Sequence, residues 1–308
     1  MRLPPSRARA PIALLGVVAI AFLSAGTARA QTSGARPVIT SAPDVVGFKR
    51  DARIEGRLED GTPGDEVSLE RRPPGLDWRT IATETTDSEG NVVFRVDSLR
   101  KTAEYRLAWS DEVSGASTYS DTDSIGVRPL LTLRASRARV LIGRTVVFWG
   151  ALRPATAGRE VVLQHRVAGE WRTFARVGAS DGDFVARYDA NRRGRRRIRV
   201  RFGGDGVNAA ATRGRRVTVF RKAPATWYGP GFYGERTACG RRYTYGMLGV
   251  AHRTLPCGTE VALLHEGRYI TVPVIDRGPY GSADLDLTRE TAERLRFSGR
   301  DTIGFLRD

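Results

Sequence analysis

The chain has 308 residues, which is enough for two or three domains of ordinary size. Its net charge of +16 is unevenly spread, because residues 129–219 hold 20 basic and 6 acidic side chains while residues 31–128 hold 13 basic and 18 acidic ones. After the first thirty residues no stretch is long and apolar enough to cross a bilayer, so we do not expect a membrane-spanning protein.

Residues 1–30 have the pattern of a secretory signal peptide. Three arginines precede the apolar run PIALLGVVAIAFLSAG, and the segment ends at the small-residue cleavage pattern Ala28-Arg29-Ala30. A membrane anchor needs about 20 apolar residues, and this run is shorter. No cysteine lies near the cleavage site to which a lipid could be attached. We predict cleavage after Ala30 and a secreted, periplasmic or cell-wall location without a lipid anchor.

A pattern of sequence occurs twice in the middle of the chain. The stretch GDEVSLE begins at Gly64 and GREVVLQ begins at Gly158, and a Trp-Arg-Thr motif follows each of them, at Trp78 and at Trp171. A period of about 93 residues is too long for a solenoid and suits tandem domains. We expect both tryptophans to lie in or near a core.

The repeated regions, residues 31–128 and 129–220, are rich in signals for short strands. Apolar positions alternate with polar ones, and turns such as Glu89-Gly90 and Asp181-Gly182 separate them. We predict a mainly β protein that begins with two tandem β-sandwiches resembling immunoglobulin-like or fibronectin-like modules.

The densest basic stretch is NRRGRRRIRVRF, Asn191 to Phe202. A patch of this kind attracts polyanions. For an exported protein we expect an anionic wall polymer or lipid headgroups as the partner, and not nucleic acid. The alternative is a solvated strand face in an arginine-rich sequence.

The composition changes after Phe220. The segment RKAPAT, Arg221 to Thr226, is typical of a short joint, and the last domain, residues 223–308, is glycine-rich and aromatic at its start. We predict strands at Glu260–His265, Tyr269–Ile275 and Asp301–Leu306, and one helix that begins near the N-cap residue Thr288. Mostly β structure with one short helix favours a small barrel.

The two cysteines, Cys239 and Cys257, both lie in this last domain. In an exported protein an even pair predicts a disulfide, whose loop closure is worth about 3 kcal/mol. The pair and the nearby His252 and His265 do not have the spacing of a zinc site, so we expect no metal and no cofactor.

Two acids ten residues apart stand out in TVPVIDRGPYGSADLDLTRE, namely Asp276 and Asp286. Two carboxylates that face one cleft push their pKa values apart and leave one of them as an acid, while Arg277 lowers the pKa of whichever acid it pairs with. The alternatives are structural: Asp276 can bind backbone amides in a turn, and Asp286 can cap the helix that follows.

Four stretches in order carry a resemblance: ATWYGPGFYGERTACG, VAHRTLPCGTEV, VPVIDRGPYG and DLDLTRETAERL. They resemble the rare lipoprotein A (RlpA)-like family, whose fold is a six-stranded double-psi β-barrel related to that of expansins. The resemblance covers about Ala223 to Asp308. It implies a lytic transglycosylase that acts on peptidoglycan, in which one carboxyl group protonates the glycosidic oxygen and helps to form a 1,6-anhydro sugar.

The resemblance also implies site residues. The catalytic residues that it implies are Asp276, which we predict to be the acid/base, Asp286 and His252. The substrate-binding residues that we expect beside them are Thr226, Trp227, Tyr228, Arg277 and Tyr280.

One position departs from the family pattern, because the glutamate that often follows the Thr-Ala-Asn-Gly motif is replaced by Arg241. Three functions therefore remain open. The first is a lytic transglycosylase, the second an expansin-like barrel that binds wall glycans without cutting them, and the third a stalk of sandwiches with the barrel as a cap.

Overall fold

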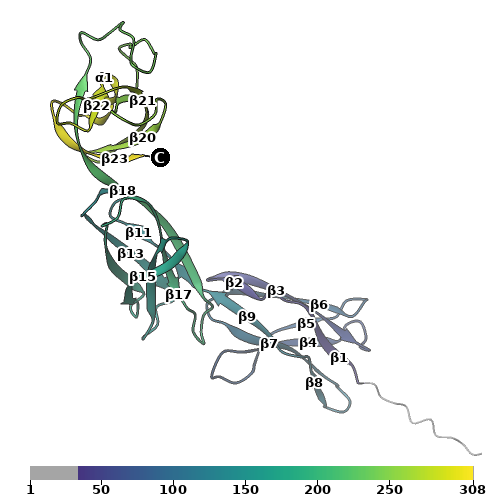
Figure 1. Cartoon of the computed structure of the whole chain (residues 1–308). Helices are drawn as coiled ribbons and strands as arrows, with labels where there is room; N and C mark the ends of the chain where they lie inside the picture. Colours follow the sequence, from purple (N-terminus) through teal and green to yellow (C-terminus); the bar gives the residue numbers. More distant parts are fainter. Residues whose placement is uncertain (1–33, 308) are drawn as a thin grey trace, which may run out of the picture.

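The computed structural model describes residues 34–307, which form three β-rich units arranged end to end (Figure 1). The predicted signal peptide, residues 1–30, lies outside the described residues. Within residues 34–307 no helix has the length and apolarity that a membrane span requires. The only helix in this part of the chain is α1 (Arg289–Leu295), which lies in the last unit.

The first unit consists of two sheets around one core. Its strands are β1 (Arg36–Ser41), β2 (Val45–Gly47), β3 (Arg50–Glu59), β4 (Glu66–Arg72), β5 (Arg79–Thr85), β6 (Asn91–Leu99), β7 (Ala103–Ser110), β8 (Ser117–Tyr119) and β9 (Asp123–Arg128). One sheet has the order β1-β3-β6, and the other has the order β2-β9-β7-β4-β5, with β8 beside β7. Alternate residues such as Ile54, Leu69 and Leu107 are fully buried in a shared apolar cluster, as period-two patterning requires.

The second unit repeats this plan. Its strands are β10 (Leu130–Leu131), β11 (Arg134–Ala135), β12 (Arg139–Leu141), β13 (Thr145–Arg153), β14 (Glu160–Val167), β15 (Glu170–Gly178), β16 (Asp183–Asp189), β17 (Gly194–Phe202) and the first part of β18 (Ala211–Tyr228). Strands β10, β11 and β16 pair with β13, and the second sheet runs β15-β14-β17-β18. Phe148, Leu163 and Val200 lie in the core between them.

The two repeated tryptophans lie at the edge of the packed interior. Both are partly buried. The guanidinium groups of Arg72 and Arg106 lie 4.6 and 4.4 Å from the ring centroid of Trp78, and that of Arg199 lies 4.1 Å from Trp171. The guanidinium groups cover part of each indole ring, so the two rings are shielded from water although they are not buried in the core.

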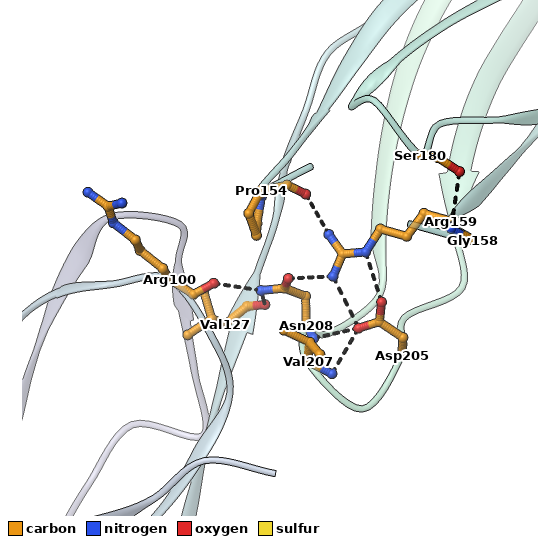
Figure 2. Close-up of polar contacts among 9 residues, drawn as sticks. All are labelled: Arg100, Val127, Pro154, Gly158, Arg159, Ser180, Asp205, Val207 and Asn208. Carbon is orange, nitrogen blue, oxygen red and sulfur yellow. Dashed lines mark hydrogen bonds and ion pairs between the residues drawn. The ribbon is translucent and has the colours of Figure 1, made fainter. Parts of the chain in front are cut away.

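A buried polar network joins the first unit to the second (Figure 2). The guanidinium of Arg159 is 4% exposed and donates to both carboxylate oxygens of Asp205, at 2.8 and 3.2 Å, and to Asn208 Oδ1 at 2.7 Å. The amide of Asn208 in turn donates to the carbonyls of Arg100 and Val127 in the first unit, at 3.0 and 3.1 Å. Each buried polar group of the joint therefore has a partner.

Strand β18 joins the second unit to the third. It pairs with β17 along residues 211–219, then with β23 (Asp301–Arg307) along residues 221–225, and finally with β22 (Leu285–Thr288) along residues 225–228. The segment Arg221 to Thr226, which the sequence predicted to be a joint, is thus the middle of a continuous strand that passes into the last unit (Figure 1).

The third unit is a closed barrel. Its strands are the end of β18, β19 (Val250–Ala251), β20 (Glu260–His265), β21 (Arg268–Asp276), β22 and β23. They follow the order β18-β22-β19-β21-β20-β23, and β23 pairs back to β18, which closes the ring. Val261, Leu263 and Ile303 are fully buried inside it.

Helix α1 covers this core. As the sequence predicted, Thr288 is its N-cap and its hydroxyl accepts a hydrogen bond from the Thr291 amide. The helix buries Ala292 and Leu295, and it ends at Arg296 in the left-handed conformation.

Candidate active site on the C-terminal barrel

Four neighbouring strands place the two acids in one row. Thr226 on β18 is paired with Asp286 on β22, and Ala251 on β19 is paired with Asp286 on one side and with Asp276, the last residue of β21, on the other. Residues paired across a sheet have side chains on the same face. Thr226, Asp286 and Asp276 therefore lie along one side of the sheet, with only the small side chain of Ala251 between the acids.

Asp286 is the more enclosed acid of the row. The hydroxyl of Thr226 donates a 2.8 Å hydrogen bond to its Oδ1. Burial raises the pKa of Asp286, the bond from Thr226 opposes this shift, and the nearby negative charge of Asp276 adds to it. Asp286 therefore holds a proton more readily than an ordinary aspartate does.

Asp276 has a different environment. Its Oδ1 accepts 2.8 Å hydrogen bonds from the backbone amides of Ala238 and Arg277. These two N–H groups compensate negative charge at that oxygen, so the protein provides donors for the carboxylate form. Oδ2 of Asp276, like Oδ2 of Asp286, has no hydrogen bond to any residue in the described part of the chain.

The loop that supplies the Ala238 amide is fixed from both ends. Thr237 is buried and accepts hydrogen bonds from Gly240 and Arg241. The predicted disulfide between Cys239 and Cys257 is confirmed, with the two Cα atoms 5.6 Å apart. Ala238 is thereby held between a capped turn and a covalent crosslink, which positions its amide over Asp276.

The side chain of Arg277 pairs with neither acid, a pairing that the sequence had left open. Its Nη1 donates to the carbonyl oxygens of Leu255, at 2.8 Å, and His252, at 3.3 Å. The side chain thus fixes the segment after β19, and only the backbone amide of Arg277 contacts Asp276.

His252 is not among the side chains that the row brings together. Its Nδ1 accepts hydrogen bonds from the amides of Thr254 and Leu255, at 3.2 and 3.1 Å, and its ring lies parallel to that of Phe305, 5.9 Å away. His252 follows Ala251 directly, and successive side chains of a strand point to opposite faces. Its backbone amide donates to the Asp276 carbonyl at 3.2 Å, but no hydrogen bond among the described residues joins its side chain to either acid, so the catalytic role predicted for it has no side-chain contact to support it.

Tyr228 lies close to both acids. Burial raises its pKa, and the negative charges of Asp276 and Asp286 raise it further, so the phenol stays protonated. Its hydroxyl oxygen is buried and has no hydrogen-bond partner among residues 34–307. Tyr228 therefore places a buried, uncharged phenol close to the two carboxyl groups.

The other predicted substrate-binding residues lie at the surface. The side chain of Trp227 is 37% exposed, and that of Tyr280, in the loop after Asp276, is 86% exposed. Arg241, in the position where the family pattern favours an acid, is also exposed. The described residues contain no group of three or more His, Cys, Asp or Glu side chains arranged to hold a metal ion.

Two structural residues of the site were missed from the sequence. Tyr243 is buried, donates to the Tyr228 carbonyl at 3.1 Å and accepts from the Arg289 amide at 3.2 Å, so it ties the aromatic loop to helix α1. Arg253 donates to three carbonyls of the loop between the acids, those of Pro279, Gly281 and Ala283. Neither role has a local sequence signal, because both depend on chain segments far away.

Comparison with known proteins identifies the fold family of the last unit. A family model described as "Lytic transglycolase" matches residues 222–304. Together with the relatives below, this match shows that the last unit is an RlpA-like double-psi β-barrel.

Curated relatives share this segment. A "Probable endolytic peptidoglycan transglycosylase RlpA" of Synechocystis sp. is 46% identical over 91 residues, which cover 29% of this chain and 27% of the relative. The "Endolytic peptidoglycan transglycosylase RlpA" of Campylobacter jejuni is 42% identical over 74 residues, 23% of this chain and 27% of the relative. An Aquifex aeolicus "Probable endolytic peptidoglycan transglycosylase RlpA" is 46% identical over 74 residues, 23% of this chain and 33% of the relative. The matched segment is thus about a third or less of each of these proteins.

Proposed function

We propose that this protein acts on the glycan strands of peptidoglycan in the cell wall and cleaves them as a lytic transglycosylase. The observation that carries the proposal is the row of Asp276 and Asp286, two carboxyl groups in unlike environments on one side of an RlpA-like barrel. The RlpA proteins of Synechocystis and Campylobacter are named as peptidoglycan transglycosylases and supply the substrate class.

The reaction needs one proton donor that later acts as a base. The acid protonates the glycosidic oxygen as the bond from this oxygen to the sugar carbon C1 breaks. The resulting carboxylate takes the proton of the C6 hydroxyl of the same sugar, whose oxygen bonds to C1 and forms the 1,6-anhydro ring. The acid regains its proton and no water is consumed.

In this scheme Asp286 holds the proton and Asp276 carries the negative charge. The raised pKa of Asp286 favours the first role, and the two amides at Oδ1 of Asp276 favour the second. A charged carboxylate stabilises positive charge that develops at C1. The sequence placed the acid/base role on Asp276 alone, and the contacts favour a role shared by the pair.

Aromatic side chains beside the row are suited to sugar. Tyr228 places a buried, protonated phenol close to both acids. Trp227 and Tyr280 expose ring surface on which the apolar face of a pyranose can stack. We assign these residues, with Thr226, to glycan binding.

We propose further that residues 31–128 and 129–220 are immunoglobulin-like or fibronectin-like modules that act as a spacer for the barrel domain, residues 223–308. The buried Arg159 network and the shared strand β18 support a stiff connection. We also propose export, with a signal peptide cleaved after Ala30 and no lipid anchor. The arginine-rich strand β17 is suited to an anionic wall polymer or lipid headgroups.

A second candidate is an expansin-like barrel that binds wall glycans without cutting them. The observation in its favour is Arg241, which is exposed at the position where many family members carry an acid. A groove that lacks this acid but keeps its aromatic rings can still hold a sugar chain.

Incubation of the full chain with purified peptidoglycan separates the two candidates. Release of 1,6-anhydro products by the wild type, and none by Asp276→Asn, supports cleavage. Glu293→Gln is the matched control, because it removes one carboxylate from an exposed position on α1. Tight pull-down with no anhydro product contradicts cleavage and supports the binding module.

A further inference from the structure

A cavity of about 390 Å³ lies where the second unit meets the barrel. Its lining residues come from both units and are Arg193, Arg221, His252, Leu255, Phe305, Leu306 and Arg307. Arg193 directly precedes β17, Arg221 lies in the middle of β18, and Arg307 ends β23. The cavity therefore depends on the contact between the units that β18 connects (Figure 1).

The charge of the lining is strongly positive. Three arginines line the cavity, and Arg221 is the only one of them with an ion pair to a carboxylate in the described part of the chain, at 2.7 Å from Asp284. Neither Arg193 nor Arg307 forms such a pair with residues 34–307. Five N–H donors on each guanidinium group match the planar geometry of carboxylate or phosphate.

His252 adds a neutral donor. Its Nδ1 accepts hydrogen bonds from two amides, those of Thr254 and Leu255. Burial lowers the pKa of His252 and the charge of Arg221 lowers it further, so the ring is neutral at pH 7 and Nε2 carries the proton. The Nε2–H group has no partner among the described residues and is free to donate.

One wall of the cavity is apolar. Phe305 is 6% exposed, His252 stacks on its ring, and Arg221 lies 4.3 Å from the ring centroid. Leu255 and Leu306 extend this wall. A site with an apolar wall and several arginines in its lining suits a molecule that has both an uncharged body and an anionic group.

We propose that this cavity binds an oxyanion, a carboxylate or a phosphate, carried on an organic group about the size of one sugar or amino acid. The volume is within the range of small-molecule sites. The oxyanion contacts Arg193, Arg307 and His252, and the body of the ligand lies against Phe305.

The site is separate from the row of acids. The side chain of His252 points away from Asp276 and Asp286, and burial, Arg221 and Asp284 are the main influences on its pKa. Because one of its arginines belongs to the second unit, an isolated barrel lacks part of the site. Binding of the anion does not depend on glycan cleavage, so each proposal can fail without the other.

Titration calorimetry on the full chain tests the proposal with three probes: N-acetylmuramic acid, inorganic phosphate and the uncharged N-acetylglucosamine. The variant pair Arg193→Gln and Arg307→Gln removes two cavity cations, whereas Arg201→Gln and Arg213→Gln, on the exposed surface of the second unit, make the matched control. We expect at least one anionic probe to bind the wild type and the control equally, and the cavity variant about tenfold or more weakly.

The two anions distinguish the sources. Preference for N-acetylmuramic acid indicates a carboxylate of the glycan, and preference for phosphate indicates a phosphate-bearing polymer. Near-UV circular dichroism establishes that the cavity variant keeps its native fold, and if Gln at both positions unfolds the chain, the single variant Arg307→Gln replaces it. The proposal is overturned if neither anion binds, or if the cavity variant and the control lose affinity equally.

Discussion

The hydroxyl of Thr226 lies 2.8 Å from Oδ1 of Asp286, although sixty residues separate the two along the chain. Thr226 is near the end of the strand that leaves the second unit, and Asp286 belongs to the strand before helix α1. The strand that connects the units therefore also supplies a hydrogen bond to the buried acid. This contact makes the proton affinity of the acid sensitive to a residue that performs no chemistry.

Replacing Thr226 with valine removes the hydroxyl and preserves the shape of the side chain. Because this hydrogen bond lowers the pKa of Asp286, its loss raises that pKa further. In the proposed mechanism cleavage requires protonated Asp286, so activity declines as the pH rises through this pKa, and the decline moves to higher pH in Thr226→Val. A pH–rate profile of anhydro-product release measures the shift.

Thr226→Ser is the control for this change, since it keeps the hydroxyl. Its profile should overlay that of the wild type. If the pH–rate profiles of both variants shift equally, or if neither profile shifts, the hydrogen bond does not set the proton affinity of Asp286.

Asp286→Asn should make the protein more stable at neutral pH. The folded-state pKa of Asp286 is raised above its unfolded value, so its contribution to stability is complete below the unfolded pKa of about 3.9 and is lost as the pH rises through the folded pKa. At pH 7 the wild type bears the cost of a buried charge that the amide avoids. The midpoint of thermal unfolding should therefore be higher in the variant at pH 7, with the difference shrinking toward pH 3.

Glu293→Gln again serves for comparison, because its carboxylate is exposed on α1. It should show no such pH-dependent gain. A variant Asp286→Asn that is less stable than the wild type at pH 7 would contradict the raised pKa.

Loss of the Cys239–Cys257 bridge should lower the free energy of unfolding of the barrel by about 3 kcal/mol, because the bridge closes a loop of this length in the unfolded chain. Urea unfolding of Cys239→Ser/Cys257→Ser measures the loss. The wild type in a thiol reductant should unfold like the variant. A loss well under about 1 kcal/mol would mean that the bridge adds little to the stability of the loop that carries Ala238.

Asn208→Ala should loosen the joint between the first two units. The substitution removes the donors to the carbonyls of Arg100 and Val127 and one acceptor of the buried Arg159 (Figure 2). Unsatisfied groups of this kind cost about 1–3 kcal/mol. We expect a lower unfolding midpoint and faster hydrogen exchange at the amide of Ala209, which donates to Val127.

Asn191→Ala provides the comparison, because Asn191 is exposed in the loop before β17. It should leave both quantities unchanged. Equal effects of the two substitutions would remove the reason to regard the Asn208 network as a stiff connection.

The sequence predicted the barrel and its row of acids better than the connection that leads to them. Motif order indicated the double-psi barrel, and the resemblance implied that Asp276 and Asp286 both belong to its site. The segment around Pro224 resembled a joint because proline usually interrupts a strand. In the structure β18 changes from partner β23 to partner β22 at Ala225, so the missing amide of Pro224 falls beside a change of partner.

The side-chain directions were less predictable. His252 belongs to a motif that resembles a groove segment, but it follows Ala251 in the chain, and strand alternation turns its ring to the opposite face. The guanidinium of Arg277 donates hydrogen bonds to the carbonyls of His252 and Leu255 and does not bind the adjacent acid, Asp276. The direction of the Arg277 side chain depends on tertiary packing around the end of β19, which residue spacing does not encode.

Digestion of purified peptidoglycan by the full chain tests the central claim most directly, with mass-spectrometric counting of 1,6-anhydro ends in the wild type, Asp276→Asn and Asp286→Asn. The account predicts anhydro products from the wild type and a loss of about 100-fold or more in each variant, since a positioned acid or base contributes at least that much. Wild-type protein that binds the glycan and forms no anhydro ends, or an Asp286→Asn variant as active as the wild type, would contradict it.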